Sequence, residues 1–497
     1  MNPADQQDIQ ALAKGGRTNF LGFLLRLLGT APFLFIAGRL YGVEALGVYA
    51  SAVLIAELAA QLCALGQRRG LAQRLAEEGR DPAHAVADGL LLTLLLSLVV
   101  AGLLYLIPAP MFPSGQYSSY DRLLPFAIIP NALTDVMLAA LAYGYNVAAT
   151  VRARSLIEPW VQTLTAVAFL WLAHEGGFGP AGGLALSYLF SKIAAALFAF
   201  FPLLRSLGLP KGWRPYPARL VKLVAQSAPL AGADLVEWGS RRLDLAILGF
   251  LTSPTAVGVY FAAQQVASLP QKLKTSFEPI LGPVITRNIK EGNYAAIAHQ
   301  VCQVGFWIVA MQAGIALALG IPGPNVMGLL GKDFVGGTGA LGFLLAAEVV
   351  AATAVVSEAA LVYLARLPNL AISLFTITLQ GVLTFVGVEL VEIYGFNDKF
   401  AAAAAAGSLA LSLGVASLLK ARLLSKILAH PINNWRWPLV WAAAPAVLVG
   451  WLTQRWLPSW AGLAVGVPAI LLSYGFVIWH KGFGPEDRVL FRRNVGA

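Results

Sequence analysis

The segment at residues 45–52 reads ALGVYASA, and residues 256–263 repeat it in altered form as AVGVYFAA. The two glycines, Gly47 and Gly258, lie 211 positions apart (258 − 47). Each copy follows a long apolar segment and a turn, and each begins another apolar segment. Ala, Val and Gly are common in this chain, so a chance echo is the alternative, but the shared setting favours a duplicated helical bundle.

The composition identifies the class of protein. Of the 497 residues, 58% are hydrophobic and 12% are charged, and the mean hydropathy is +0.70. Average soluble domains carry about 25% charged residues. Many apolar runs are about 20 residues long, which is the length that spans a bilayer as a helix, whereas a β-barrel shows shorter alternating segments. We therefore predict an all-α, polytopic membrane protein.

Proline and glycine punctuate the apolar runs into fourteen predicted spans. The repeat and the links between spans divide the chain into an N-terminal bundle at 1–205, a basic linker at 206–225, a C-terminal bundle at 226–430, and two extra spans with a tail at 431–497. The fourteen spans are approximately 19–40, 44–66, 86–107, 122–144, 155–174, 181–204, 226–250, 254–276, 298–320, 336–362, 369–391, 399–421, 437–457 and 460–480.

Basic residues in the short links predict the orientation. Links on one side carry 24 Lys and Arg residues, and links on the other side carry 5. Lys and Arg are enriched in cytoplasmic links, so both termini are predicted to be cytoplasmic, in the inner membrane. The net charge of +10 does not indicate nucleic-acid binding, because the cations are spread over these links. Two further segments, 68–78 and 277–290, are predicted to lie at the interface.

The link at 205–225 is the longest basic stretch, and Trp213 and Tyr216 lie among its cations. It is predicted to be the linker between two bundles, with its aromatic rings at the headgroup level. The alternative function for this stretch is binding of anionic lipid or of a partner protein.

Enzyme motifs and metal-ligand spacings are absent from the sequence. There is no His-Glu-x-x-His pair, and Gly331-Lys332 lacks the spacing of a phosphate-binding loop. Two cysteines, Cys63 and Cys302, provide no disulfide framework. We expect a transporter rather than an enzyme, with no metal site and no cofactor other than a proton or sodium gradient.

The seventh predicted span is the richest in ionisable residues. Asp234, Glu237, Arg241 and Asp244 are spaced three, four and three apart, so they share one face of a helix. Arg242 lies about 100° from that face. This face is predicted to line a hydrated cavity, in which either arginine is a candidate for substrate binding. The alternative is an ion-pair ladder from Glu237 to Arg241 that fixes packing.

Other cations within spans have two interpretations. Arg26 either extends to the cytoplasmic interface, as long side chains do, or binds phosphate in the cavity. Lys272 and Lys274 lie at the cytoplasmic end of the eighth span and are further substrate-binding candidates, although an interfacial position suits at least one of them. Lys192 in the sixth span is isolated in the sequence, and we predict no functional role for it.

Four acidic residues also fall inside spans: Glu57, Asp135, Glu348 and Glu358. Ionisable residues there are costly and face the bundle interior or a wet cavity. Together with Asp234, Glu237 and Asp244, Glu57 and Asp135 are candidates for coupling to protons or Na⁺. The alternative for each is a hydrogen bond that holds two helices together.

Several motifs resemble those of bacterial polysaccharide (oligosaccharide) flippases, which belong to the superfamily of multidrug and toxin extruders and lipid II flippases. Residues 38–49, reading GRLYGVEALGVY, resemble the entry to the second span of that family. Residues 242–249 and 256–263 resemble its passage from span seven to span eight. The segment from Pro270 through Pro283 to residues 291–293 is also similar.

The resemblance implies a V-shaped transporter of two six-helix bundles, with the last two spans as additions. It implies an undecaprenyl-diphosphate-linked oligosaccharide as substrate, moved for surface polysaccharide, exopolysaccharide or lipopolysaccharide assembly. It further implies that Arg26 and Arg241 meet the diphosphate. A polysaccharide polymerase and a chain-length regulator are the partners expected beside the lipid bilayer, and no nucleic acid is expected.

Two other functions remain as alternatives. A cation-coupled multidrug or small-molecule exporter of the same fold would favour acids over cations in the cavity and would end after twelve spans. A membrane-embedded glycosyltransferase or polymerase would carry a large periplasmic loop, whereas the longest outer loop predicted here is approximately Pro108–Asp121.

Overall fold

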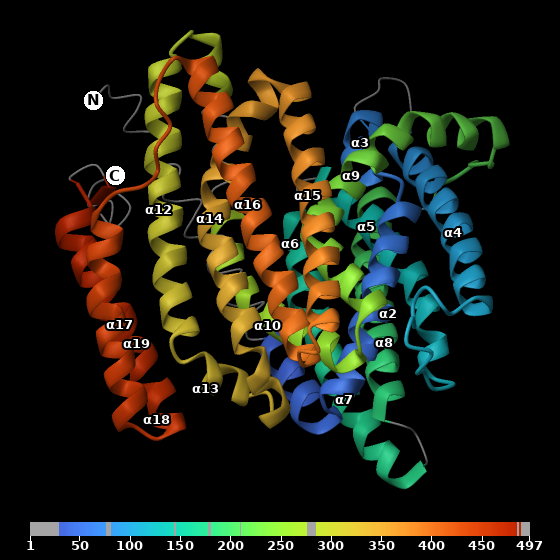
Figure 1. Ribbon diagram of the computed structural model, residues 1–497. Coiled ribbons are helices and arrows are strands. Elements are labelled where there is room, and N and C mark those ends of the chain that lie inside the picture. The colour runs from blue at the N-terminus through green and yellow to red at the C-terminus, as the bar shows by residue number, and fades with distance from the viewer. Residues whose placement is uncertain are drawn as a thin grey trace. The chain divides into compact units, whose positions relative to one another are not determined.

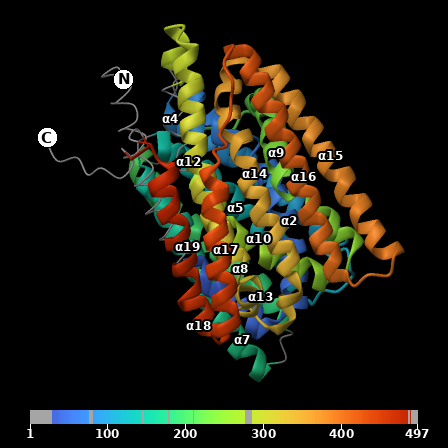
Figure 2. The same cartoon turned by 60° about the vertical axis from the view of Figure 1, so that its left-hand side comes forward.

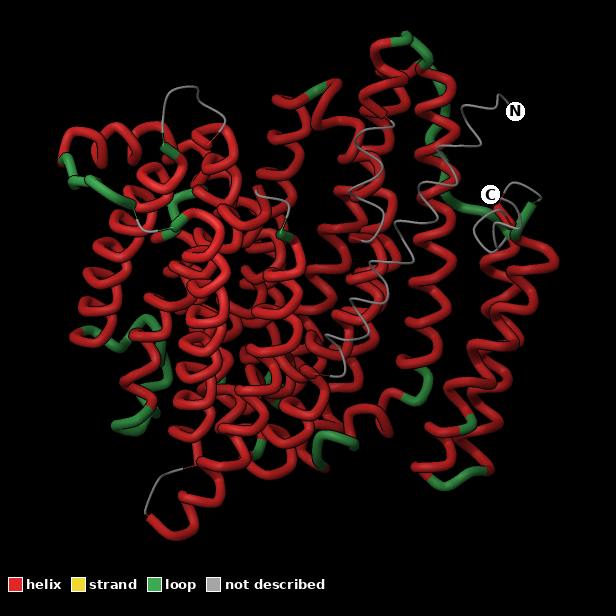
Figure 3. Tube along the Cα trace, turned by 180° about the vertical axis from the view of Figure 1, so that it is seen from behind, coloured by secondary structure: helices red, strands yellow, loops and turns green. Residues whose placement is uncertain are grey.

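A computed structural model describes residues 29–75, 81–143, 146–176, 180–208, 210–275, 285–484 and 487–488. These residues form helices joined by turns and loops, with no strand among them, as Figure 3 shows. Ten of the described helices are long and apolar enough to cross a membrane. The predicted all-α membrane class is confirmed. The count of fourteen spans stays a prediction, because the first predicted span lies partly outside the described residues.

The contacts divide the chain into two compact units. We call the described residues up to Gly258 the N-terminal unit and those from Val259 onward the C-terminal unit. Each unit is described by itself, and the predicted bundle boundaries at 205, 225 and 430 stay a prediction.

The N-terminal unit is built from long helices joined by short ones. Within it α7 packs on α8, and α5 packs on both α4 and α8. Its elements are η1 (Ala37–Tyr41), α2 (Val43–Cys63), α3 (Gln67–Leu75), α4 (Pro82–Leu106), η2 (Asp121–Ala127), α5 (Ile128–Tyr143), α6 (Val147–Val151), η3 (Arg152–Ile157), α7 (Glu158–Gly176), α8 (Pro180–Leu207), α9 (Pro217–Leu251) and the first turn of α10 (Pro254–Thr275).

The two copies of the repeated segment meet each other inside this unit. A Cβ atom built on Gly47 would lie 1.7 Å from the Pro254 carbonyl oxygen, and one built on Gly258 would lie 2.1 Å from the Val43 carbonyl oxygen. The start of α10 therefore crosses α2 with backbone against backbone. Small residues permit this closeness between membrane helices. The two glycines of the repeat thus form one reciprocal contact.

The turns at the helix ends follow from local sequence. Gly42 separates η1 from α2 with a φ of +91°, a conformation that favours glycine. The Asp81 side chain accepts a hydrogen bond from the Ala83 amide at 2.9 Å, and Pro82 occupies the first turn of α4, as proline does at helix starts. These residues therefore explain where α2 and α4 begin.

In the C-terminal unit α14 packs along α16 (Figure 1). Ala401, Ala402, Ala405 and Ala406 are buried on α16, and such small side chains permit close helix packing. The elements are the remainder of α10, α12 (Tyr294–Gly320), α13 (Gly323–Gly328), η4 (Lys332–Gly337), α14 (Thr338–Leu364), α15 (Arg366–Ile393), α16 (Asp398–Leu428), α17 (Pro438–Trp456), α18 (Ser459–Ala464), α19 (Gly466–Val477) and η5 (Ile478–Gly482).

The last two long helices pack on each other and on α12. Helices α17 and α19 lie side by side (Figure 2), and both contact α12. Trp307 of α12 is fully buried, and its indole N–H donates a hydrogen bond to Asp487 at 2.8 Å. The Arg436 guanidinium pairs with the same carboxylate at 2.7 Å. Asp487 is thus tied to the core of this unit.

A short segment connects α8 and α9 within the stretch 206–225. Helix α8 continues to Leu207 and α9 begins at Pro217, because the apolar residues Leu220, Val221, Leu223 and Val224 extend the helical pattern beyond the predicted start. The Trp213 indole N–H donates to Asp88 of α4 at 2.9 Å. We call residues 208–216 the connecting segment.

Candidate functional site

A network of charged side chains lies inside the N-terminal unit. Its four members come from four elements of this unit: Asp135 from α5, Arg154 from η3, Glu158 from the start of α7 and Lys192 from α8. Their side chains are 21%, 20%, 17% and 6% exposed, respectively. We call these four residues the charge network.

Arg154 is the centre of the charge network. One terminal nitrogen contacts Asp135 Oδ1 at 2.5 Å, and the other contacts Glu158 Oε2 at 2.8 Å and donates to the Asn131 side-chain oxygen at 2.9 Å. Arg suits this role because its planar guanidinium presents several donors in a fixed arrangement. A lysine at this position would offer a single nitrogen and would not hold both carboxylates.

Glu158 connects the two cations of the charge network. Its Oε2 meets Arg154, and its Oε1 lies 2.5 Å from Lys192 Nζ. The same ammonium lies 4.7 Å from the centre of the Tyr188 ring, within the range of a cation–π contact. The two carboxylates and two cations balance in charge, which is the arrangement that makes burial of ions tolerable.

The repeated segment reaches the charge network through Tyr49. The Tyr49 ring lies 6.1 Å from the Tyr188 ring in an edge arrangement, and Tyr188 in turn lies under Lys192. The Gln162 side-chain nitrogen donates to the Tyr49 hydroxyl at 2.6 Å. Tyr49 is 4% exposed. The first copy of the motif therefore has two roles: Gly47 lies at the crossing of α2 with α10, and Tyr49 packs beside the charge network.

A π-helical turn, η3, positions Arg154. This wider turn covers Arg152–Ile157 and ends where Glu158 begins α7. Wider turns of this kind occur often at functional sites because they shift side chains relative to a regular helix. Here the turn presents Arg154 toward α5, while Glu158, four residues later, reaches α8.

The two carboxylates of the charge network can accept protons or bind cations, and its two cations can bind anions. Protonation of either carboxylate would leave a cation without its counter-charge. Breaking a buried pair by losing one partner costs about 3–5 kcal/mol. Such a cost is large enough to favour a different arrangement of the helices that carry the four residues.

A second ion pair joins α2 and α9. The Arg242 guanidinium lies 3.2 Å from Glu57 Oε2, and both side chains are 30% exposed. Near this pair the Gln61 side chain donates to the Asp234 carbonyl oxygen at 3.2 Å. The sequence left open which of the two adjacent arginines acts, and the structure shows that Arg242 contacts an acid of α2.

The predicted polar face of α9 divides into buried and exposed parts. Asp234 is 5% exposed and Asp244 is fully buried, whereas Arg241 is exposed. The Asp244 carboxylate accepts a hydrogen bond from the Leu245 amide at 2.8 Å. The Glu237 side chain lies outside the described residues, so the predicted ladder from Glu237 to Arg241 stays a prediction.

Other predicted residues lie elsewhere. Arg26 falls outside the described residues, as do the side chains of Lys272 and Lys274 in α10. In the C-terminal unit, Glu358 of α14 pairs with Lys420 of α16 at 3.0 Å, and Lys420 also donates to the Ser373 hydroxyl at 3.1 Å. Of the predicted acids, therefore, Glu57, Asp135 and Glu358 each have a basic partner.

Sequence reasoning missed most of the charge network. Lys192 is not isolated, because α8 brings it against Glu158. Arg154 and Lys420 were counted among link cations, whereas Arg154 lies in a helical turn inside the unit and Lys420 is 5% exposed in α16, which continues to Leu428. The spacing of Arg154 and Glu158, four apart, was the available signal. Nothing in the sequence pointed from this pair to Lys192.

The sequence also matches a known protein family. Residues 36–317, more than half of the chain, match the family described as polysaccharide biosynthesis protein. The chain belongs to this family. The matched region includes both copies of the repeated segment, the charge network and the Glu57–Arg242 pair. No curated protein matches the sequence as a relative.

Three solved structures have a similar fold. The lipid II flippase MurJ in an inward closed conformation has a TM-score of 0.63 at 13% identity, covering 94% of this chain and 99% of that one. An inward-facing multidrug resistance MATE family transporter has a TM-score of 0.60 at 15% identity, covering 85% and 94%. A MOP superfamily transporter from Pyrococcus furiosus, whose binding pocket has reversed polarity, has a TM-score of 0.55 at 14% identity, covering 86% and 96%.

These similarities show the fold. The chain is a multi-pass membrane protein of the polysaccharide biosynthesis family with the fold of multidrug and lipid II transporters. The predicted resemblance is confirmed.

Proposed function

We propose that this protein is a flippase that moves undecaprenyl-diphosphate-linked oligosaccharides from the cytoplasmic to the periplasmic leaflet for polysaccharide assembly. It is not an enzyme in this proposal, and both of its termini are cytoplasmic. The observation that carries the proposal is the family match over residues 36–317. The fold shared with the lipid II flippase supports it, because that protein is named for moving a lipid-linked substrate.

The physical problem of the reaction is the polar head of the substrate. The sugar and diphosphate must cross hydrocarbon while the lipid tail stays in the bilayer. A hydrated cavity that opens sideways permits this, and alternating access then rocks one bundle against the other. Arginines are suited to meet the diphosphate because their paired donors match phosphate oxygens. Arg241, Arg242, Arg26, Lys272 and Lys274 are the proposed contacts.

The charge network is the proposed coupling site. Asp135 and Glu158 would take up a proton or Na⁺, releasing Arg154 and Lys192 and shifting the packing of α5, α7 and α8. The support is the partial exposure of Asp135 and Glu158, whose side chains are 21% and 17% exposed. Intramembrane acids that combine pairing with access to water are typical of proton relays.

Deletion of the gene is expected to stop polysaccharide assembly. Lipid-linked repeat units should accumulate facing the cytoplasm, because the sugar cannot cross hydrocarbon unaided. Surface polysaccharide and the sidedness of the lipid-linked sugar would be measured, with the wild-type gene restored as the control. Normal polysaccharide in a strain that lacks any second copy would contradict the proposal, and drug sensitivity with intact polysaccharide would favour the exporter.

Arg241→Ala is expected to lower transport about tenfold or more at unchanged expression, because a charge-assisted hydrogen bond contributes about 1.5–3 kcal/mol. The matched control is Arg455→Ala, which removes an equally exposed cation from α17. Transport of the lipid-linked sugar into vesicles is the measurement. Full activity of Arg241→Ala would remove this arginine from the mechanism.

A further inference from the structure

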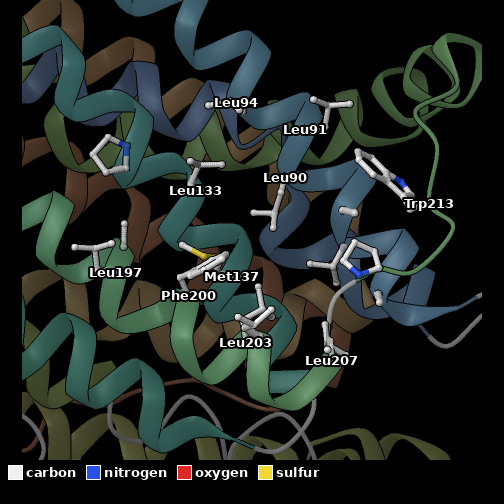
Figure 4. A pocket seen from close by; sticks show the side chains of 18 of the residues that line it. Leu90, Leu91, Leu94, Leu133, Met137, Leu197, Phe200, Leu203, Leu207 and Trp213 are labelled. Atoms are coloured by element: carbon white, nitrogen blue, oxygen red, sulfur yellow. The ribbon is translucent and has the colours of Figure 1, made fainter.

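A pocket lies in the N-terminal unit, apart from the charge network. It is bounded by α4, α5, α8 and the connecting segment, and its volume is about 530 Å³. Figure 4 shows the side chains that face it, among them Leu90, Met137, Phe200 and Leu207. This volume is within the range of pockets that hold small molecules, about 300–1,000 Å³.

The lining of the pocket is hydrocarbon. The residues that surround it are Ala, Val, Leu, Ile, Met, Phe, Pro and Gly, with Trp213 as the one side chain that carries a polar atom. The Trp213 indole N–H already donates to Asp88 Oδ1 at 2.9 Å, so the tryptophan offers its ring to the pocket. A ligand here would have to be apolar over the part that enters.

The wall made by the connecting segment is held in place by hydrogen bonds. Asp88, the acceptor for Trp213, is 2% exposed on α4. The His84 ring also lies 2.9 Å from the Lys211 carbonyl oxygen. Two residues of α4 thus anchor the segment across the end of the bundle, and Pro210 and Trp213 complete the pocket.

Three exposed cations are the sequence neighbours of residues that line the pocket. Arg205, Lys211 and Arg214 are exposed, and each is the direct neighbour in sequence of a lining residue: Leu204, Pro210 and Trp213, respectively. The pocket therefore combines a hydrocarbon interior with three cations beside it. Basic clusters at the cytoplasmic side of membrane helices recognise anionic lipid head groups.

We propose that this pocket binds an anionic phospholipid of the cytoplasmic leaflet, with a hydrocarbon chain inside and the phosphate against Arg205, Lys211 and Arg214. A pocket of this volume accommodates acyl chains of ordinary length, whereas the polyprenyl chain of a sugar carrier is much longer. The site stands apart from the transported substrate and does not depend on the proposed function. The bound lipid would fasten the connecting segment to α4 and α8.

The test uses the purified full-length protein reconstituted in vesicles of phosphatidylglycerol and phosphatidylcholine. After re-extraction in mild detergent, the lipid retained per protein would be measured by native mass spectrometry. Wild type is expected to retain phosphatidylglycerol in preference to phosphatidylcholine. The triple variant Arg205→Gln, Lys211→Gln, Arg214→Gln is expected to retain about a hundredfold less, since each of the three cations near the surface contributes about 1 kcal/mol.

Two further variants complete the design. Arg366→Gln, Arg422→Gln, Lys426→Gln removes three exposed cations from the C-terminal unit and should retain as much phosphatidylglycerol as wild type. Ala87→Phe, which fills the pocket from α4, should lose the lipid while the three cations stay unchanged. The proposal would be overturned if both triple variants retained equal amounts of lipid, or if wild type showed no preference between the two lipids. It would also be overturned by unchanged retention in Ala87→Phe, or by recovery of a polyprenyl phosphate from the native membrane in place of phospholipid.

Discussion

Glu158→Gln is expected to abolish transport and to lower the thermal stability of the protein. Glutamine has nearly the same shape but no charge, so Lys192 loses its 2.5 Å partner and Arg154 loses one of its two. Removing one member of a buried ion pair costs about 3–5 kcal/mol. Thermal unfolding in detergent and transport into vesicles would be measured. The matched control is Glu291→Gln, whose pair with Arg287 at 3.9 Å is exposed and contributes under about 1 kcal/mol.

A double variant separates a structural role of the charge network from a coupling role. Glu158→Gln with Lys192→Met removes one acid and one cation, so the charges balance again. Replacing a buried ion pair with uncharged groups of similar volume is often neutral in stability. We therefore expect stability to return toward wild type while transport stays absent. Transport that returns together with stability would show that the network only holds the helices in place.

Gly47→Ala and Gly258→Ala are each expected to prevent folding of the N-terminal unit. A Cβ atom would lie 1.7 Å from a carbonyl oxygen in the first variant and 2.1 Å in the second, and backbone cannot yield as a flexible side chain does. Separating the helices would also break the ring contact between Tyr49 and Tyr188. The loss should be at the upper end of the 1–3 kcal/mol typical of overpacking, or beyond it. Yield of monodisperse protein on gel filtration is the measurement.

The control for the glycine variants is Gly102→Ala in α4, where a Cβ atom would meet nothing within 4 Å. This change is expected to leave the yield unchanged or to raise it slightly, since alanine is the better helix former. A normal yield of Gly47→Ala would contradict the close crossing of α2 and α10.

Much of the fold followed from local sequence. The predicted spans 44–66 and 254–276 correspond to α2 and α10, and the predicted span 399–421 corresponds to about the first three quarters of α16. These predictions succeed because an apolar run of membrane-spanning length and its flanking Gly or Pro residues are local properties of the chain. The extension of α16 to Leu428 was missed because Lys420 looked like the end of a span.

The candidate site was predictable only in fragments. Asp135 was identified because an acid within an apolar run is conspicuous, and Glu57 for the same reason. Their partners were not identified, because Arg154 follows a link and Lys192 lies 34 positions beyond Glu158. Pairing of this kind depends on which helix faces are adjacent, and a single sequence does not contain that information.

The sequence alone was sufficient to predict a helical membrane protein that resembles the polysaccharide family, because span length, hydropathy and the ALGVYASA motif are local properties of the chain. Only the tertiary structure decided that Gly47 and Gly258 touch each other's helices, and that two acids and two cations meet between α5, η3, α7 and α8. Whether a segment spans the bilayer depends on its own length and hydropathy. A close helix crossing or a buried ion pair, in contrast, depends on which two segments are adjacent in the folded protein.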